Sequence, residues 1–189
     1  ALLEMLKLVE KAAPTAKWHI FGAIGSVVYV GLATASLMAL PEFLVIIVVG
    51  IVIFTDTGAY FTGRMFGKRK IAPAISPSKT WAGLYGGMLF AGLFAACAFG
   101  FVQLAATALS PAKPPMPYTA MAVGGAIGAS LAVVAQAGDF FESWLKRKAG
   151  VKDSSNLIPG HGGVFDRVDG LLPVAIVAGL ASLLFVSGH

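Results

Sequence analysis

The sequence predicts an all-α integral membrane protein with five transmembrane helices and an N-terminal helix that is amphipathic or partial. Of its 189 residues, 57% are hydrophobic and only 12% are charged, and the mean hydropathy is +0.82. A soluble domain carries roughly a quarter charged residues, so this chain has too little polar surface to face water on all sides. The single cysteine, Cys97, excludes a disulfide framework and a thiolate metal site.

Five segments are long and apolar enough to cross the hydrocarbon, which takes about 20 residues in a helix. Four of them contain no Asp, Glu, Lys or Arg, and the fifth contains Asp56. The predicted spans are residues 21–40, 43–63, a stretch within 80–112, 118–138 and 170–188. We therefore expect a polytopic membrane domain, which contains the catalytic groups, at residues 18–189.

The first 17 residues are too charged to span a membrane. Leu2, Leu3, Leu6 and Val9 are spaced for one apolar helical face, whereas the intervening positions carry glutamate and lysine. We therefore expect an N-terminal interfacial helix at residues 1–17.

The basic residues predict the orientation of the spans. All but one of the 14 lysines and arginines lie before the first span, between the second and third, or between the fourth and fifth; Lys113 is the exception. By the positive-inside rule, the N-terminus and the loops at residues 64–82 and 139–169 face the cytoplasm.

Acidic residues gather at the cytoplasmic ends of the second, fourth and fifth spans, where one interfacial cavity can collect them. Asp139, Glu142, Ser143 and Lys146 form a single helical stripe, and the alternative is an ordinary solvated helix end. The acids concerned are Asp56, Asp139, Glu142, Asp153, Asp166 and Asp169.

Two further patterns point to the same membrane face. Asp166 and Asp169 are three residues apart and are expected on one face at the start of the fifth span. The glycines at residues 160–163 allow backbone N–H groups to approach an anion, although such a stretch can also be a simple turn with His161 as a loop histidine. Asp56 lies inside a span, where an acid is costly and typical of a functional site.

The loop at residues 64–82 supplies the opposite charge. Its five cations suit phosphate oxygens, and Ser76, Ser78 and Thr80 are expected at a kinked helix entry with anion-binding hydroxyls; membrane topology alone also accounts for the cations. Oxygen ligands favour Mg²⁺ over zinc. Together these patterns predict phosphoryl or nucleotidyl transfer to a membrane lipid, without the P-loop motif GxxxxGK[ST].

Residues 143–169 resemble the signature of the phosphatidate cytidylyltransferases, the CDP-diacylglycerol synthases. The segments at residues 56–81 and 136–143 also resemble that family, which often has a lysine at the position of Ser78 and an acid at that of Ala82. Members usually have more N-terminal helices than this chain. The matching signature positions are Ser143, Lys146, Arg147, Lys152, Asp153, His161, Gly162, Gly163, Asp166, Arg167 and Asp169.

The resemblance implies transfer of CMP from CTP to phosphatidic acid, giving CDP-diacylglycerol and pyrophosphate. It implies catalytic roles for Asp139, Asp166, Lys146 and Arg167. It also implies that Asp139, Asp166, Asp169 and Asp56 hold Mg²⁺, and it leaves a second cation open. It places the protein in the bacterial inner membrane with the site facing the cytoplasm. The implied substrate-binding residues are Arg64, Ser76, Lys79, Thr80, Glu142, Ser143, Arg147, Lys152, Asp153, His161, Gly162 and Gly163.

Several alternatives stay open. The chain could be a related CTP-dependent transferase or kinase that acts on another lipid, or a catalytically incomplete membrane transport or assembly protein. The GxxxG spacings of Gly83 with Gly87 and Gly124 with Gly128 support close helix packing and leave a homodimer open. The expected partners are CTP, phosphatidic acid and the bilayer, with no nucleic acid.

Overall fold

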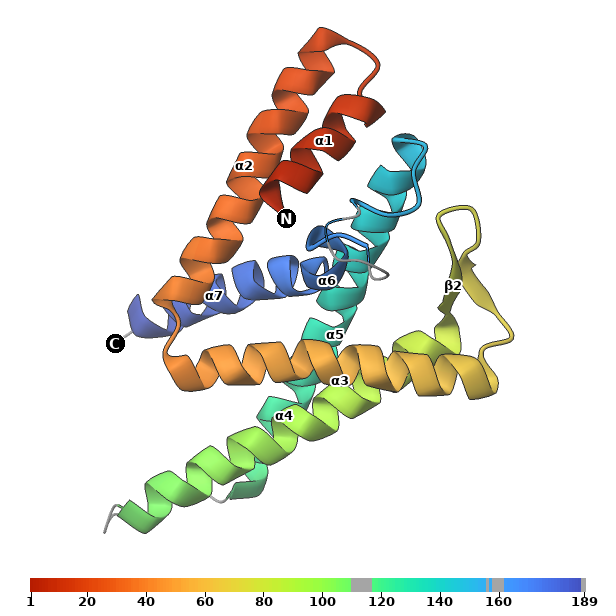
Figure 1. Ribbon diagram of the computed structural model, residues 1–189. Helices are drawn as coiled ribbons and strands as arrows, with labels where there is room; N and C mark the ends of the chain where they lie inside the picture. Colours follow the sequence, from red (N-terminus) through yellow and green to blue (C-terminus); the bar gives the residue numbers. More distant parts are fainter. Residues whose placement is uncertain (110–116, 156, 158–161, 188–189) are drawn as a thin grey trace. The chain divides into compact units, whose positions relative to one another are not determined.

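The computed structural model describes residues 1–109, 117–155, 157 and 162–187. Within these ranges the chain forms helices and one two-stranded sheet (Figure 1). The elements in chain order are α1 (Leu2–Ala12), α2 (Ala16–Ala39), α3 (Glu42–Phe66), β1 (Lys70–Ala72), β2 (Ser76–Thr80), α4 (Trp81–Leu109), α5 (Pro117–Lys148), α6 (Phe165–Val168) and α7 (Leu171–Ser187).

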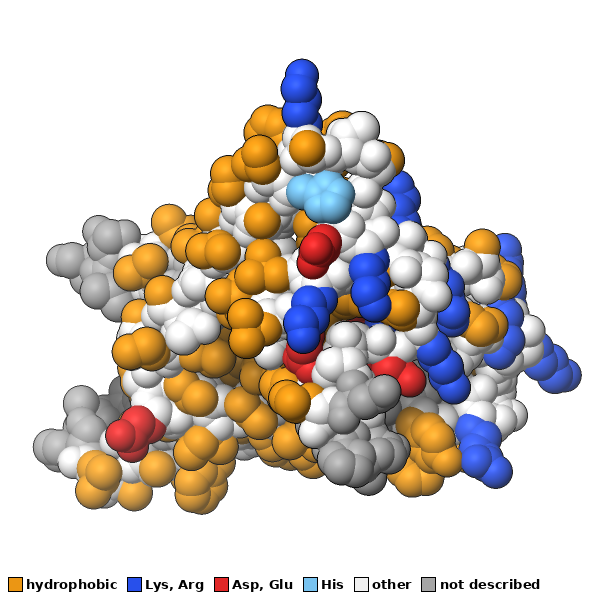
Figure 2. Space-filling model, turned by 45° about the horizontal axis from the view of Figure 1, so that its top comes forward, with side chains coloured by type: hydrophobic (Ala, Val, Ile, Leu, Met, Phe, Trp, Pro, Cys, Tyr) orange, Lys and Arg blue, Asp and Glu red, His pale blue; other side chains and the backbone are white. Residues whose placement is uncertain are grey.

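The helices confirm the predicted class of membrane protein. The four helices α2, α3, α4 and α5 are each long and apolar enough to cross a membrane. Helix α7 covers the fifth predicted span with 17 residues, which is close to the lower limit of about 17 for a spanning helix. Figure 2 shows many hydrophobic side chains on the surface, as expected for helices that contact lipid.

The chain folds as two compact units. The first contains Ala1–Pro41, Ala74–Pro77 and Ala135–His189, and the second contains Glu42–Pro73 and Ser78–Val134. All predicted site residues after position 134 therefore belong to the first unit.

Glycines bring the helices of the second unit into close contact. A Cβ atom added to Gly58 of α3 would lie 2.6 Å from the carbonyl oxygen of Gly86 in α4, and one added to Gly124 of α5 would lie 2.8 Å from that of Ala95. Gly83 and Gly128 face neighbouring helices of the same chain in a similar way. Because these glycines serve packing within the chain, their spacing gives no support to a homodimer, which stays a prediction.

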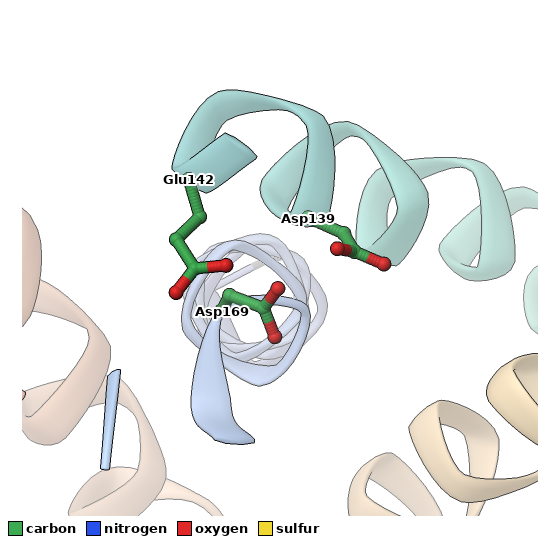
Figure 3. A group of neighbouring side chains, drawn as sticks. All are labelled: Asp139, Glu142 and Asp169. Atoms are coloured by element: carbon green, nitrogen blue, oxygen red, sulfur yellow. The ribbon is translucent and has the colours of Figure 1, made fainter. Parts of the chain in front are cut away.

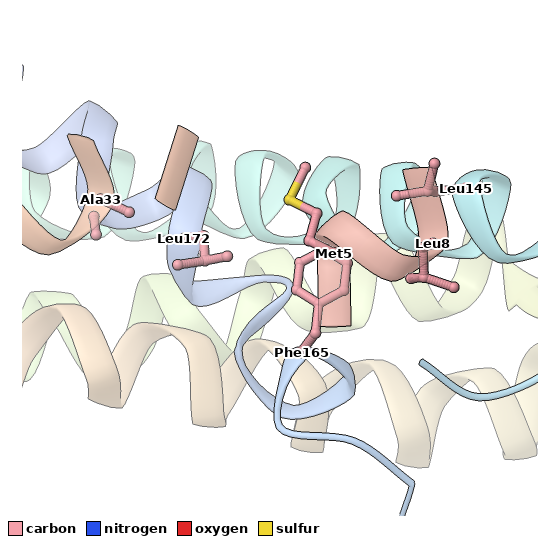
Figure 4. Close-up of a cluster of buried hydrophobic side chains, with 7 residues drawn as sticks. Met5, Leu8, Ala33, Leu145, Phe165 and Leu172 are labelled. Atoms are coloured by element: carbon pink, nitrogen blue, oxygen red, sulfur yellow. The ribbon is translucent and has the colours of Figure 1, made fainter. Parts of the chain in front are cut away.

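The first unit has a core in which α1 takes part. Met5 and Leu8 pack with Leu145 of α5, Phe165 of α6 and Leu172 of α7 in one buried cluster (Figure 4). The apolar face of α1 was predicted only in part: Val9 packs against this cluster, but Leu3 is 73% exposed, and the buried residues are Glu4, Met5 and Leu8. Helix α1 is part of the core because Met5 and Leu8 lie in the same buried cluster as Phe165.

The helical entry predicted around residues 76–80 is also wrong, because Ser76–Thr80 is strand β2, paired with β1. Helix α4 begins directly afterwards, and the backbone N–H of Gly83 donates to Thr80 Oγ1 at 3.0 Å. Thr80 is 3% exposed. Its hydroxyl therefore caps a helix, which satisfies a backbone donor that has no partner within the helix.

Candidate active site

Small residues place the end of α5 against the junction between α6 and α7. Pro173 has no N–H to donate to the carbonyl of Asp169 four residues earlier, so the chain cannot continue as one helix through this point. A Cβ atom on Gly138 of α5 would collide with that carbonyl oxygen and lie 2.6 Å from Pro173 Cγ. The helix break thus brings Asp169 beside the stripe of polar residues on α5.

Three carboxylates meet at this contact. Asp139 and Glu142 extend from α5 toward Asp169 (Figure 3), and each offers an oxygen atom such that all three atoms lie within 4.8 Å of one another. The helical spacing of Asp139 and Glu142 predicted their common face, and helix α5 continues unbroken through Lys148. The structure therefore brings together two of the four predicted metal ligands and adds Glu142.

Glu142 is the most deeply buried member of this group. Its side chain is 2% exposed, and its Oε1 atom has no hydrogen-bond partner among the described residues. Ionised carboxylates at this separation repel one another by on the order of 3 kcal/mol per pair at an effective dielectric constant of about 20. A shared proton, a bound cation or a neighbouring ammonium group relieves this repulsion.

These features fit a divalent cation with oxygen ligands. Mg²⁺ binds through one or two carboxylates and keeps open positions for water or phosphate oxygens. Asp139, Glu142 and Asp169 supply such oxygen atoms, and the unpaired Glu142 Oε1 is a buried acceptor that a cation would satisfy. Among the described residues the group contains no histidine or cysteine, and the preference for Mg²⁺ over zinc stays a prediction.

Lys146 links this group to Asp166. Its ammonium nitrogen lies 2.9 Å from Glu142 Oε2 and 2.8 Å from Asp166 Oδ1. Two of the three donors of the ammonium group are thus used by carboxylates of the protein. Lys146 holds the last turn of α5 to α6 and offsets part of the negative charge at the site.

Asp166 is held by the loop that precedes it. Its Oδ2 atom accepts hydrogen bonds from the backbone N–H of Ser154 at 3.0 Å, the hydroxyl of Ser154 at 2.9 Å and the N–H of Gly163 at 2.7 Å. Partial burial raises the pKa of Asp166, but hydrogen bonds from the Lys146 ammonium group and from these amides outweigh burial and lower it. Asp166 is therefore ionised at neutral pH.

This loop differs from its predicted form in one respect. Asp166 and Asp169 do not open the fifth span, because Asp166 lies within the short helix α6 and Asp169 directly follows it with helical φ and ψ, before α7 begins. The backbone N–H of Gly163 approaches an anion, as the glycines were expected to allow, and this anion is the carboxylate of Asp166; a role of the glycine in binding phosphate stays a prediction. Gly162 adopts a φ of +80°, and a Cβ atom there would lie 2.7 Å from Asp166 Oδ2, so the glycines fit the loop around this carboxylate.

The other predicted residues of the first unit differ in their exposure. Ser143 is partly buried on α5, and Arg147 is exposed and donates from Nε to the carbonyl oxygen of Ile75 at 3.3 Å. Lys152, Asp153 and Arg167 are exposed. Ser76 is buried in β2, and His161 lies outside the described residues.

The remaining predicted residues belong to the second unit. Asp56 is exposed on α3, and Arg64, one turn beyond Tyr60, donates from Nη1 to the Tyr60 hydroxyl at 3.1 Å. Lys79 is partly buried in β2. The roles of Asp56 in metal binding and of Arg64 and Lys79 in substrate binding stay predictions.

Two polar residues of the first unit, Ser154 and Glu4, were missed from the sequence, and a third, Gln136, was covered only by the resemblance. Ser154 holds Asp166, and Glu4 accepts hydrogen bonds from the loop before Asp166. Gln136, one helical turn before Asp139 and Phe140, is 4% exposed and its Nε2 atom has no partner among the described residues. The resemblance in residues 136–143 pointed to Gln136, whereas no local pattern distinguishes Glu4 from the other charges of its helix.

Comparisons with known proteins agree on one family. The model of the cytidylyltransferase family matches residues 2–185. A phosphatidate cytidylyltransferase of Pseudomonas aeruginosa is 40% identical over 159 residues, which are 84% of this chain and 53% of the relative. That of Haemophilus influenzae is 46% identical over 131 residues, 68% of this chain and 42% of the relative. The chain thus spans about half the length of these curated relatives or less.

Proposed function

Since the chain belongs to the cytidylyltransferase family, we propose that it transfers CMP from CTP to phosphatidic acid, forming CDP-diacylglycerol and pyrophosphate. The names of its relatives support this substrate pair, because the matched phosphatidate cytidylyltransferases of three different bacteria share 40% to 46% of the aligned residues with it. Helices that can cross a membrane suit an acceptor that diffuses within the bilayer.

The observation that carries the proposal is the convergence of Asp139, Glu142 and Asp169 beside the Lys146 and Asp166 pair. Nucleotidyl transfer gathers several negative phosphates in one place, and catalysis depends on positioning them and neutralising their charge. A cluster of carboxylates that can hold a hard metal ion, with exposed basic side chains nearby in the sequence, meets both requirements.

We propose that the group holds Mg²⁺ when the enzyme is loaded with CTP. Asp139, Glu142 and Asp169 would supply the oxygen ligands, and Asp166 joins the site through Lys146; a direct bond from Asp166 to the cation stays a prediction. Bound Mg²⁺ would neutralise charge on the phosphate oxygens of CTP during transfer.

The reaction needs no covalent enzyme intermediate. An oxygen of the lipid phosphate forms a bond to the α-phosphorus of CTP, the bond from that phosphorus to the bridging oxygen breaks, and pyrophosphate leaves with the electron pair. The attacking phosphate is already ionised at neutral pH, so the site needs no general base. Arg147, Lys152 and Arg167, all exposed, are the cations of the first unit that we expect to bind phosphates.

The basic loops support a proposal for the location of the site. Loops at residues 64–82 and 139–169 carry most of the cations of the chain, so we propose that the site faces the cytoplasm from the bacterial inner membrane. Phosphatidic acid would arrive by diffusion in the bilayer, and CTP would enter from the aqueous side.

The test follows the label of CTP into lipid. The purified chain in detergent is incubated with phosphatidic acid, Mg²⁺ and CTP labelled on either the α- or the γ-phosphorus. Label from the α-position in lipid, with release of pyrophosphate and loss of activity in EDTA, is the expected result. Label from the γ-position would indicate a lipid kinase, and transfer to an isoprenoid alcohol in place of phosphatidic acid would also contradict the proposal.

A further inference from the structure

Glu4 is a buried acid on a helix whose sequence suggested only a surface role. Its residue is 6% exposed, although it lies on the short amphipathic helix α1. A buried carboxylate is costly unless it is paired or hydrogen-bonded. The contacts of Glu4 therefore indicate what the helix does.

The Glu4 carboxylate accepts hydrogen bonds from the chain immediately before Asp166. The backbone N–H of Val164 donates to Oε1 at 2.9 Å, and that of Phe165 donates to Oε2 at 2.8 Å. The hydroxyl of Ser155 also donates to Oε1. Glu4 thus binds both the start of α6 and the loop that carries Ser154.

Two carboxylates divide three consecutive backbone donors between them. Gly163 donates its N–H to Asp166 Oδ2, and the next two residues donate theirs to Glu4. A Cβ atom on Gly163 would collide with Ser154 Oγ and Glu4 Oε1. The glycine therefore allows the turn to fit closely between the two acids.

Apolar packing fixes α1 in the position that this contact needs. Met5 and Leu8 lie in the buried cluster with Phe165 and Leu145 (Figure 4). In the sequence, Phe165 directly precedes Asp166, and Leu145 directly precedes Lys146. Helix α1 thus shares one buried cluster with the residues that precede both partners of the Lys146 and Asp166 pair. A change in α1 would act on both partners of that pair.

We propose that Glu4 is a positioning residue. It holds the turn at residues 163–166 so that Asp166 meets Lys146 beside the cluster of Asp139, Glu142 and Asp169. The proposal rests on the proposed function for its consequence in catalysis. Its structural step does not, because the contacts of Glu4 with the turn exist without substrate.

The experiment compares Glu4→Gln with Glu10→Gln. Glutamine keeps the size of the side chain but replaces an acceptor oxygen with a donor, and Glu10 is an exposed glutamate of the same helix. Hydrogen–deuterium exchange is measured on the purified chain in detergent, without CTP or metal. We expect amides of the 163–166 turn to exchange about tenfold faster in Glu4→Gln, and those of α4 to be unchanged.

Kinetics supply the second measurement. With Mg²⁺, CTP and phosphatidic acid, Glu4→Gln should lower kcat about tenfold and change the KM for phosphatidic acid less than twofold, because the turn positions the centre and not the lipid tails. Glu4→Asp, which keeps the charge, should recover part of the exchange protection and of kcat. Glu10→Gln should match the wild type in both assays.

Three outcomes would overturn the proposal. One is wild-type exchange at the turn in Glu4→Gln, another is an equal effect in Glu10→Gln, and the third is faster exchange throughout the chain in both Glu4→Gln and Glu4→Asp. If the wild type shows no transfer of CMP, the proposed function fails, and the exchange measurement still decides whether Glu4 holds the turn.

Discussion

The contact between α3 and α4 and the contact between α5 and the α6–α7 junction are held together by different forces. The first is a long helix pair in which glycines such as Gly58 allow one backbone to approach another. The second also uses small residues, but it is completed by the ion pairs of Lys146 and the hydrogen bonds of Asp166. The helix pair therefore depends on shape, and the junction depends on charge.

This difference separates stability from activity. Loss of a glycine from the helix pair inserts atoms into a close contact, which costs packing energy wherever it occurs. Loss of a charge from the junction leaves its partners buried without compensation and also removes a group that the proposed chemistry needs. Substitutions in the two regions should consequently have distinguishable effects on unfolding and on turnover.

The largest expected effect is on turnover. Asp139→Asn removes a charge from the carboxylate group with little change of size, and we expect kcat for CMP transfer to fall at least about 100-fold because phosphate charge is no longer neutralised. Pyrophosphate release in detergent measures this loss. Glu42→Gln, at an exposed acid in the first turn of α3, is the control and should keep wild-type turnover.

The metal requirement offers a check on the same prediction. Removing Mg²⁺ with EDTA should abolish turnover of the wild type, and returning Mg²⁺ should restore it. Near-native turnover of Asp139→Asn at saturating Mg²⁺ would contradict the assignment of this carboxylate.

The second largest effect is expected from loss of the Lys146 ion pairs, and it should appear in both the free energy of unfolding and turnover. Lys146→Met keeps an unbranched side chain but leaves Glu142 and Asp166 facing each other without the ammonium group, so we expect the free energy of unfolding to fall by about 2–3 kcal/mol. Thermal unfolding in detergent reports the change. Equal stability of variant and wild type would show that the pair contributes nothing net.

Lys148→Met is the matched control for that substitution. Lys148 is exposed two residues further along α5, where its ammonium lies 5.0 Å from the centre of the Trp144 ring. Loss of such an exposed contact costs at most about 1 kcal/mol. Its turnover should remain at the wild-type level.

A smaller effect, mainly on the free energy of unfolding, is expected in the helix pair of α3 and α4. In Gly58→Ala the new methyl group would meet the carbonyl oxygen of Gly86 at 2.6 Å and Phe90 Cβ at 2.7 Å, so the helices must separate at a cost of about 1–2 kcal/mol. Gly25→Ala is the control, because nothing lies within 4 Å of its added methyl group. It should be neutral or stabilising by up to about 1 kcal/mol, since alanine favours a helix.

The sequence predicted the features that depend on local periodicity. Hydropathy located the long helices, and the helical repeat placed Asp139 and Glu142 on one face, as observed. The short helix α6, which holds Asp166 ahead of α7, was missed. In β2, three hydroxyl residues suggested a helix start, but only Thr80 lies at the cap.

Other features could not be read from local sequence because they depend on contacts between distant residues. Glu4 meets Val164 and Phe165 across 160 or more positions, and Ser154 meets Asp166 across 12. Charged residues on an amphipathic helix ordinarily face water, so its pattern argues against a buried glutamate. Only the folded chain shows that α1 supports the junction.

The smallest expected effect concerns pH and tests that support. Burial raises the pKa of Glu4, but the hydrogen bonds from Ser155, Phe165 and Val164 lower it below its ordinary value of 4.5. A carboxyl group with a lowered pKa in the folded state stabilises the protein above its unfolded pKa, and this contribution is lost as the pH falls through the folded value. The free energy of unfolding should therefore differ between wild type and Glu4→Gln by about 1 kcal/mol at pH 7, and the difference should shrink below about pH 4.5. Chemical unfolding in detergent between about pH 7 and about pH 3 measures it. A difference that is constant over this range would show that Glu4 acts through its shape alone, and the junction would then depend on packing just as the helix pair does.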